Sequence, residues 1–197
     1  MVEISIDEID ENTPSPLSSA GADLAKDLRG IVGNEYSNKY TNRSKIMDGH
    51  TYRLYETMEF SISKCNTLSW KSGTTIASIL AGIISVAPIP ANVATFCGIM
   101  SIVGSVASTQ LPEGKINRYS CMVLYTRYVT VDYGSKQYGR AYKIRNFDGY
   151  EDADLNSSGR AHVFPETGDP YYDANQSEEY FNNGIFNEAY NAYNNIL

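Results

Sequence analysis

The sequence predicts an α+β fold, in which an antiparallel sheet of three or more strands carries a central apolar helical hairpin and flanking helices. Three observations lead to this fold class. Segments with the pattern or composition of strands stand on both sides of a long apolar run, that run has no charged side chain from Ser72 to Pro112, and both ends of the chain show helical periodicity. The length of 197 residues suits one domain.

The chain begins with an acidic stretch and then changes character. Residues 1–14 are expected to form a mobile acidic lead-in, and residues 15–197 a single α+β domain that contains the hydrophobic hairpin 72–108. Leucines at helical spacing predict a helix over residues 16–32, which Pro16 would open at its first position. The polar residues 34–49 are expected to be loop.

Three later stretches have the composition of strands. Residues 51–64 alternate between apolar and polar side chains, and residues 116–133 and 137–146 are rich in Tyr, Val and Thr around a Gly-Ser turn. Residues 147–175 carry the Gly, Asp, Asn and Pro of a loop. An apolar face at helical spacing predicts a C-terminal helix over residues 184–196.

The apolar run divides at Pro88 and Pro90, which cannot continue a helix, and Asn92 can cap a second one. The expected result is two helices of about 15–18 residues that return the chain to its starting point. The large side chains that would enter a membrane are Ile76, Ile79, Leu80, Ile83, Ile84, Val93, Phe96, Ile99, Ile102 and Val103.

Small residues recur along one side of the second helix. This packing stripe consists of Ala94, Gly98, Ser101 and Ser105. Small residues at this spacing let helix backbones approach closely, which in lipid is a main source of helix association. The stripe would therefore mediate contact between helices.

Three interpretations of the hairpin remain open: membrane insertion from a soluble fold, a permanent buried core, and a permanent membrane anchor. Each half is at or below the lower length limit of a spanning helix, about 17 residues. However, a helix with one wet face normally carries Lys or Glu on that face, and neither half does. Two short helices cannot line a pore, so insertion would require a homo-oligomer.

Charge and motifs exclude several function classes. The formal net charge is −7 and no basic patch is visible, so nucleic acid is not an expected partner. The sequence contains no nucleophile elbow, P-loop, HExxH motif or metal-ligand spacing, so neither an enzyme nor a cofactor is expected.

Three cysteines allow at most one intramolecular disulfide. Cys97 lies in the apolar run and suits a buried position. A bridge between Cys65 and Cys121 is allowed, as are free thiols.

The acidic N-terminus lacks the basic and apolar regions of a signal peptide, which leaves open both a cytoplasmic protein and a mature secreted form with an added Met1.

The order of segments resembles that of large heat-labile bacteriocins of the geobacillin type, secreted by Gram-positive bacteria. The similarity rests on Ser72–Ser108 with its Pro88–Pro90 loop, followed by Tyr119–Tyr133. It implies secretion, killing of related bacteria and an immunity protein in the producer, and it transfers no active-site residue. Colicin-type toxins also insert a hydrophobic hairpin, but their surrounding domain is all helical.

Two functions follow from these observations. The leading hypothesis is a secreted, pore-forming antibacterial toxin whose partner is the target-cell membrane. The competing hypothesis is a non-catalytic extracellular binding or structural protein in which the hairpin is permanent core.

Overall fold

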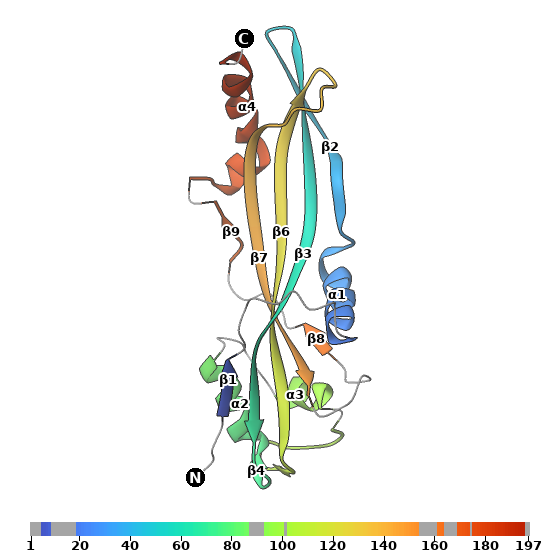
Figure 1. The fold of residues 1–197 in the computed structure, drawn as a ribbon, viewed down its shortest axis with the longest axis vertical. Helices are drawn as coiled ribbons and strands as arrows, with labels where there is room; N and C mark the ends of the chain where they lie inside the picture. Colours follow the sequence, from blue (N-terminus) through green and yellow to red (C-terminus); the bar gives the residue numbers. More distant parts are fainter. Residues whose placement is uncertain are drawn as a thin grey trace. The chain divides into compact units, whose positions relative to one another are not determined.

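The structure is a computed structural model, and it describes residues 5–8, 19–86, 93–100, 102–153, 161–163, 169–173 and 175–195. About half of the described chain, 49%, is antiparallel β structure, built around the strand order β1-β3-β6-β7-β8, with β2 paired to β3 and β9 to β7 (Figure 1). The chain divides into two compact units, and the long strands β3 (His50–Trp70), β6 (Gly114–Val131) and β7 (Tyr138–Asp152) contribute residues to both.

This architecture corrects the predicted fold class. Strands dominate, and the apolar run does not form a long helical hairpin. Its helices are α2 (Ile76–Val86), with 11 residues, and α3 (Val93–Ile99), with seven. Residues 98–108 hold two glycines, several serines and β-branched residues, all of which favour helix less than Ala or Leu. Residues 87–92, with Pro88 and Pro90, lie outside the described residues.

Unit 1 comprises residues 1–33, 62–121 and 146–167. Its elements include β1 (Ser5–Glu8), which pairs with β3, the helix α1 (Ser19–Val32), and β8 (Ala161–Val163), which pairs with β7. Helix α1 contacts β8, and its Asp27 carboxylate accepts a hydrogen bond from the Val163 N–H at 3.2 Å. The lead-in 1–14 lies outside the described residues except for β1.

Leu24 of α1 packs against strand β7 at Gly149, a residue without a side chain. A Cβ at Gly149 would lie 2.5 Å from Leu24 Cδ2 and 3.2 Å from Cys121 Sγ. The glycine therefore lets the helix approach the strand closely. Leu24 and Leu28 are fully buried, as their helical spacing predicted, whereas Ile31, which shares that spacing, is 49% exposed.

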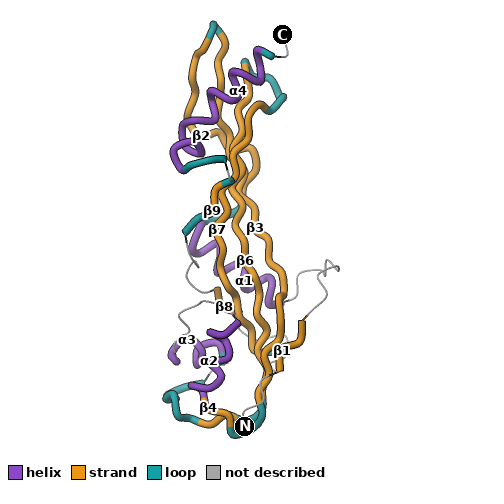
Figure 2. The backbone as a smooth tube through the Cα atoms, turned by 90° about the vertical axis from the view of Figure 1, so that its left-hand side faces the viewer, coloured by secondary structure: helices purple, strands orange, loops and turns teal. Residues whose placement is uncertain are grey.

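Unit 2 comprises residues 34–61, 122–145 and 168–197. It contains β2 (Tyr36–Met47), β9 (Tyr171–Tyr172), the π-helix η1 (Tyr180–Gly184) and α4 (Ile185–Asn194). Helix α4 packs on the sheet of this unit (Figure 2). Its core consists of Tyr52, Leu54, Val129, Val131, Ala141, Phe181, Ile185, Phe186 and Ala189.

Strand β2 occupies residues that were expected to be loop. It is a largely exposed strand that pairs with β3 and breaks register twice, with Asn38 at φ 53° and Asn42 at φ 60°. Such a strand is held by backbone hydrogen bonds and needs no apolar face, so it shows no alternation in the sequence. Its two lysines and one arginine are typical of protected sheet edges.

Candidate functional site

The charge-free segment, residues 72–112, connects two neighbouring strands of the sheet. It leaves β3 after Trp70 and returns to β6 at Gly114. The short strands β4 (Thr74–Thr75) and β5 (Gln110–Leu111) pair antiparallel across its base, and the Gly73 N–H donates to the Leu111 carbonyl at 2.8 Å. The segment is therefore an excursion from the sheet, and the pairing of β4 with β5 joins its two sides before its helices begin.

Helix α2 begins at a polar cap. The Thr75 hydroxyl accepts a hydrogen bond from the Ser78 N–H at 3.3 Å, as a helix N-cap does. Ile76 and Ile79 are fully buried, and Ile83 is 3% exposed. They belong to the core of unit 1 with Leu68, Trp70, Leu80, Phe96, Cys97, Leu111, Ile116 and Tyr150.

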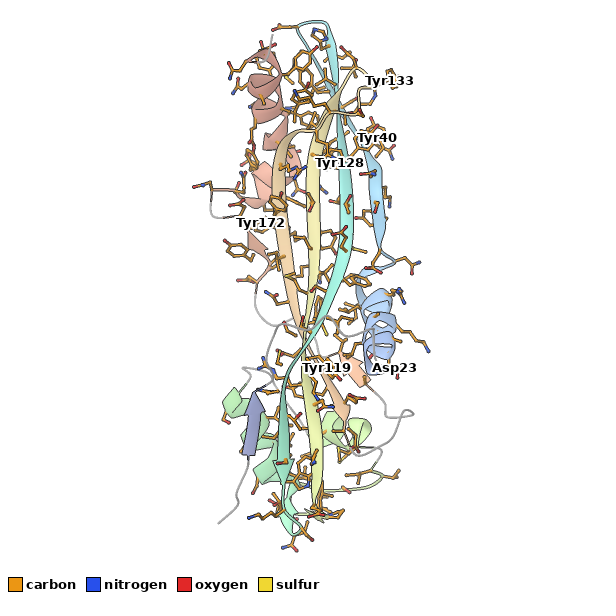
Figure 3. The ribbon with its side chains drawn as sticks, viewed as in Figure 1. Asp23, Tyr40, Tyr119, Tyr128, Tyr133 and Tyr172 are labelled. Carbon is orange, nitrogen blue, oxygen red and sulfur yellow. The ribbon has the colours of Figure 1, made fainter. Side chains whose placement is uncertain are left out.

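The opposite side of α2 is open and uncharged. Its exposed residues are Ala77, Ala81, Ile84 and Ser85. A soluble helix normally places Lys or Glu on such a face. The lack of charge there distinguishes α2 from α1, whose exposed positions include Asp23, Lys26 and Arg29 (Asp23 is marked in Figure 3).

The chain after α3 forms a loop that is tied to the start of α2. The Ala77 N–H donates to the Ala107 carbonyl at 2.9 Å and the Ile76 N–H donates to the Thr109 carbonyl at 3.0 Å. A turn closes the loop, because the Thr109 N–H donates to the Val106 carbonyl while the Thr109 hydroxyl accepts from the Val106 N–H. These bonds hold the loop in a defined conformation.

This loop presents large aliphatic side chains to solvent. Val103 is 97% exposed and Val106 is 62% exposed, and Ile84 of α2 is 49% exposed. No charged side chain lies between Ser72 and Pro112. Exposed aliphatic groups that gather in one contiguous patch are typical of surfaces that contact a partner or a lipid.

The residues that were expected to enter a membrane differ in how far they are buried. Ile76, Ile79, Leu80, Ile83 and Phe96 are buried, Ile84 and Val103 are exposed, and Val93 and Ile102 are half-buried against the core. The side chain of Ile99 lies outside what the structure describes. No helix in the described part of the chain is long and apolar enough to cross a membrane.

The predicted packing stripe does not lie on one helix. Ala94 and Gly98 are exposed residues of α3, Ser105 lies in the loop after it, and Ser101 is outside the described residues. Among the described residues beyond its own helix and chain neighbours, none has an atom within 4 Å of a Cβ placed on Gly98, so none of them makes a close helix–helix contact there.

The three thiols are free. Cys97 and Cys121 are buried, and Cys65 is half-buried. Burial, with a smaller contribution from the Asp148 carboxylate, raises the pKa of Cys121 to about 12. The Cys121 thiol is therefore protonated and a weak nucleophile.

The second helix predicted from the sequence included Val106, which the structure places in a turn. The signal was present in the surrounding residues, because Gly104, Ser105 and Ser108 favour a turn over a helix, and Gly104 adopts a φ of 71°. A valine at such a turn tends to be exposed.

Comparisons with family models, with curated protein sequences and with solved structures found no match to this chain.

Proposed function

We propose that this protein is a membrane-active antibacterial toxin whose charge-free segment contacts the lipid of the target cell. One observation carries the proposal: a structured excursion without charge exposes Ile84, Val103 and Val106. Aliphatic side chains are stabilised when they leave water, and the lack of charged neighbours avoids the large desolvation penalty that buried charges would add. Secretion and killing of related bacteria follow from the resemblance to large bacteriocins.

The free energy of burying these side chains determines how tightly the segment can bind lipid. Burial of one valine or isoleucine side chain is worth about 1.5–3 kcal/mol, so Val103 and Val106 together supply roughly 4 kcal/mol. That corresponds to a partition of about a thousandfold, which is weak and reversible. Lasting attachment would require several copies, or release of the buried side of α2 from the core.

The direct test is co-sedimentation with phosphatidylcholine vesicles. Val103→Asp and Val106→Asp should each lower the bound fraction, because a carboxylate resists transfer from water. Ile46→Asp is the matched control, since Ile46 is an aliphatic residue of unit 2 whose exposure, 76%, lies between those of Val103 and Val106. Equal binding by the wild type and all three variants would refute lipid contact by this segment.

Pore formation has its own assay. Dye-loaded vesicles should leak when micromolar protein is added, and the two aspartate variants should reduce the leakage rate. No leakage at neutral or acidic pH would exclude a pore and would leave surface contact as the only membrane role.

A second function is favoured by the buried side of α2. Four of its aliphatic side chains, Ile76, Ile79, Leu80 and Ile83, are at most 7% exposed, as permanent core requires. In that case the protein is a non-catalytic binding protein. Trp70 distinguishes the two, because it packs against Phe96 in the same core and is the only tryptophan of the chain. Vesicles should change its emission only if the segment leaves the core.

A further inference from the structure

Helix α2 finds hydrogen-bond partners for its first turn within the charge-free segment. The first four N–H groups of a helix have no acceptor inside the helix. In α2 the Ile76 and Ala77 N–H groups donate to carbonyls of Ala107–Thr109, at 3.0 and 2.9 Å. The Ser78 N–H donates to the Thr75 hydroxyl. These donors are therefore satisfied without the seven-stranded sheet.

The other hydrogen bonds of the two helices also stay within the segment. The Ser85 hydroxyl donates to the Gly82 carbonyl at 2.7 Å, and the Met100 N–H donates to the Phe96 carbonyl at 2.9 Å. Helix α2 contacts α3 and β4, which are parts of the same segment. Among the described residues of α2 and α3, none makes a hydrogen bond to the seven-stranded sheet.

Apolar side chains attach the two helices to that sheet. Those of α2 and α3 share one core with the sheet residues Leu68, Trp70, Ile116 and Tyr150. Attraction between apolar groups depends on water, and lipid tails solvate aliphatic side chains as well as a protein core does. Lipid therefore weakens this attachment and leaves the hydrogen bonds within the segment intact.

Trp70 fixes the base of the segment. Its indole N–H donates to the Pro112 carbonyl at 2.9 Å, and its ring lies against Gly114, where an added Cβ would be 2.5 Å from Trp70 Cζ2. These contacts hold the end of β3 beside the start of β6, next to the paired strands β4 and β5. The same ring meets Phe96 of α3 edge-on, with 6.1 Å between the ring centroids. The emission of Trp70 thus reports on the contact between the base and the helices.

We propose that α2, α3 and the turn Val106–Thr109 swing away from the sheet of unit 1 as one body on contact with lipid, with the paired strands β4 and β5 as the hinge. The inference rests on the proposed function, because lipid is the trigger. The movement would bring the buried side of α2 to the lipid and so strengthen the weak contact of the closed form. A segment that unravelled instead would carry unsatisfied backbone groups into lipid, which is costly.

A disulfide across the base tests the hinge. Thr75 and Gln110 are Cα partners in β4 and β5, so Thr75→Cys/Gln110→Cys can form a disulfide there. The oxidised and reduced forms should respond alike to phosphatidylcholine vesicles, with half of the Trp70 emission change at lipid concentrations that agree within about threefold. The reduced form is the matched control, because it also lacks the Thr75 cap. A larger loss of response on oxidation would overturn the proposal, since the base would then have to open.

A lipid-free experiment tests whether the helices leave the sheet as a separate body. In urea, Trp70 emission should change at a lower concentration than the far-UV circular dichroism of the strands. Phe96→Ala should lower the midpoint of the Trp70 transition and leave the midpoint of the dichroism unchanged. Leu24→Ala is the matched control, because Leu24 is as deeply buried in unit 1 but packs against β7 at Gly149. It should lower the midpoint of the dichroism alone.

The outcomes separate the hinge from the proposed function. Vesicle binding without a change in Trp70 emission would overturn the hinge and leave lipid contact standing, and so would coincident transitions in urea. A protein that ignores vesicles but shows the early Trp70 transition would refute lipid contact and the lipid trigger, while the hinged separation would remain.

Discussion

Arg127 and Glu56 form an ion pair in the interior of unit 2, with 2.6 Å between Arg127 Nε and Glu56 Oε2. Their side chains are only 14% and 12% exposed. Arg127 also donates to the Phe181 carbonyl at 2.9 Å and to the Asn182 side chain at 3.0 Å, and Glu56 accepts from the Tyr36 hydroxyl. The pair thus joins β2, β3 and β6 to the π-helix η1.

Arg127→Leu should therefore be strongly destabilising. It leaves the Glu56 carboxylate buried without its cation and removes a donor to the Phe181 carbonyl, a loss of about 3–5 kcal/mol. Urea unfolding measures the change. The double variant Arg127→Leu/Glu56→Leu should recover part of the loss, because no uncompensated charge remains. A double variant that is no more stable than Arg127→Leu would show that the remaining contacts of Arg127 dominate.

Ile83 and Ile84 are neighbours in α2 with opposite environments. Ile83 is 3% exposed and Ile84 is 49% exposed. Ile83→Ala should lower the free energy of unfolding by about 2–5 kcal/mol, because it opens a cavity beside the core of unit 1. Ile84→Ala should change it by less than about 0.5 kcal/mol. Equal effects of the two substitutions in urea would mean that α2 does not face the core in the described way.

The three thiols should differ in their rate of alkylation. Cys65 is half-buried and should react first with iodoacetamide at pH 8, whereas Cys97 and Cys121 are buried and should react only as the protein unfolds. Cys121 should be the slowest, because burial raises its pKa to about 12. Mass spectrometry of peptides gives the order. Rapid modification of Cys121 in native buffer would contradict its burial beneath α1.

The Asp132 carboxylate should make stability depend on acid pH. Its hydrogen bonds to His50 and to the Thr51 N–H, with smaller contributions from the charges of His50 and Arg53, lower the pKa of Asp132. A lowered pKa in the folded protein stabilises the fold above the unfolded value of about 3.9, and the gain disappears as pH falls through the folded value. The difference in urea midpoint between wild type and Asp132→Asn should be largest near neutral pH and should shrink below about pH 4. A constant difference from pH 3 to pH 7 would assign the effect of Asp132→Asn to turn geometry.

Periodicity predicted those elements that bury one face. The alternation of residues 51–64 placed Tyr52, Leu54 and Met58 on one side, and all three are at most 1% exposed. It failed for β2, which pairs mainly through its backbone and so leaves no apolar pattern. It also ended β3 too early, since the strand continues to Trp70 through polar residues.

The candidate segment shows a different limit of prediction. Hydrophobicity identified residues 72–112, but it could not separate the buried Ile83 from the exposed Val103, because both are β-branched aliphatics in the same uncharged run. The separation depends on where α3 ends and on the turn at Val106 and Thr109.

The paired strands β4 and β5 have a consequence for how this protein can diversify. Because Thr74–Thr75 and Gln110–Leu111 join the two sides of the excursion, a change in the number of residues between them leaves the register of β3 and β6 intact. The entropy of closing a loop grows only slowly with its length, about 0.6 kcal/mol for each doubling. Related chains are thus free to gain, lose or exchange residues at this point, and their strands should vary far less than the segment that the strands support.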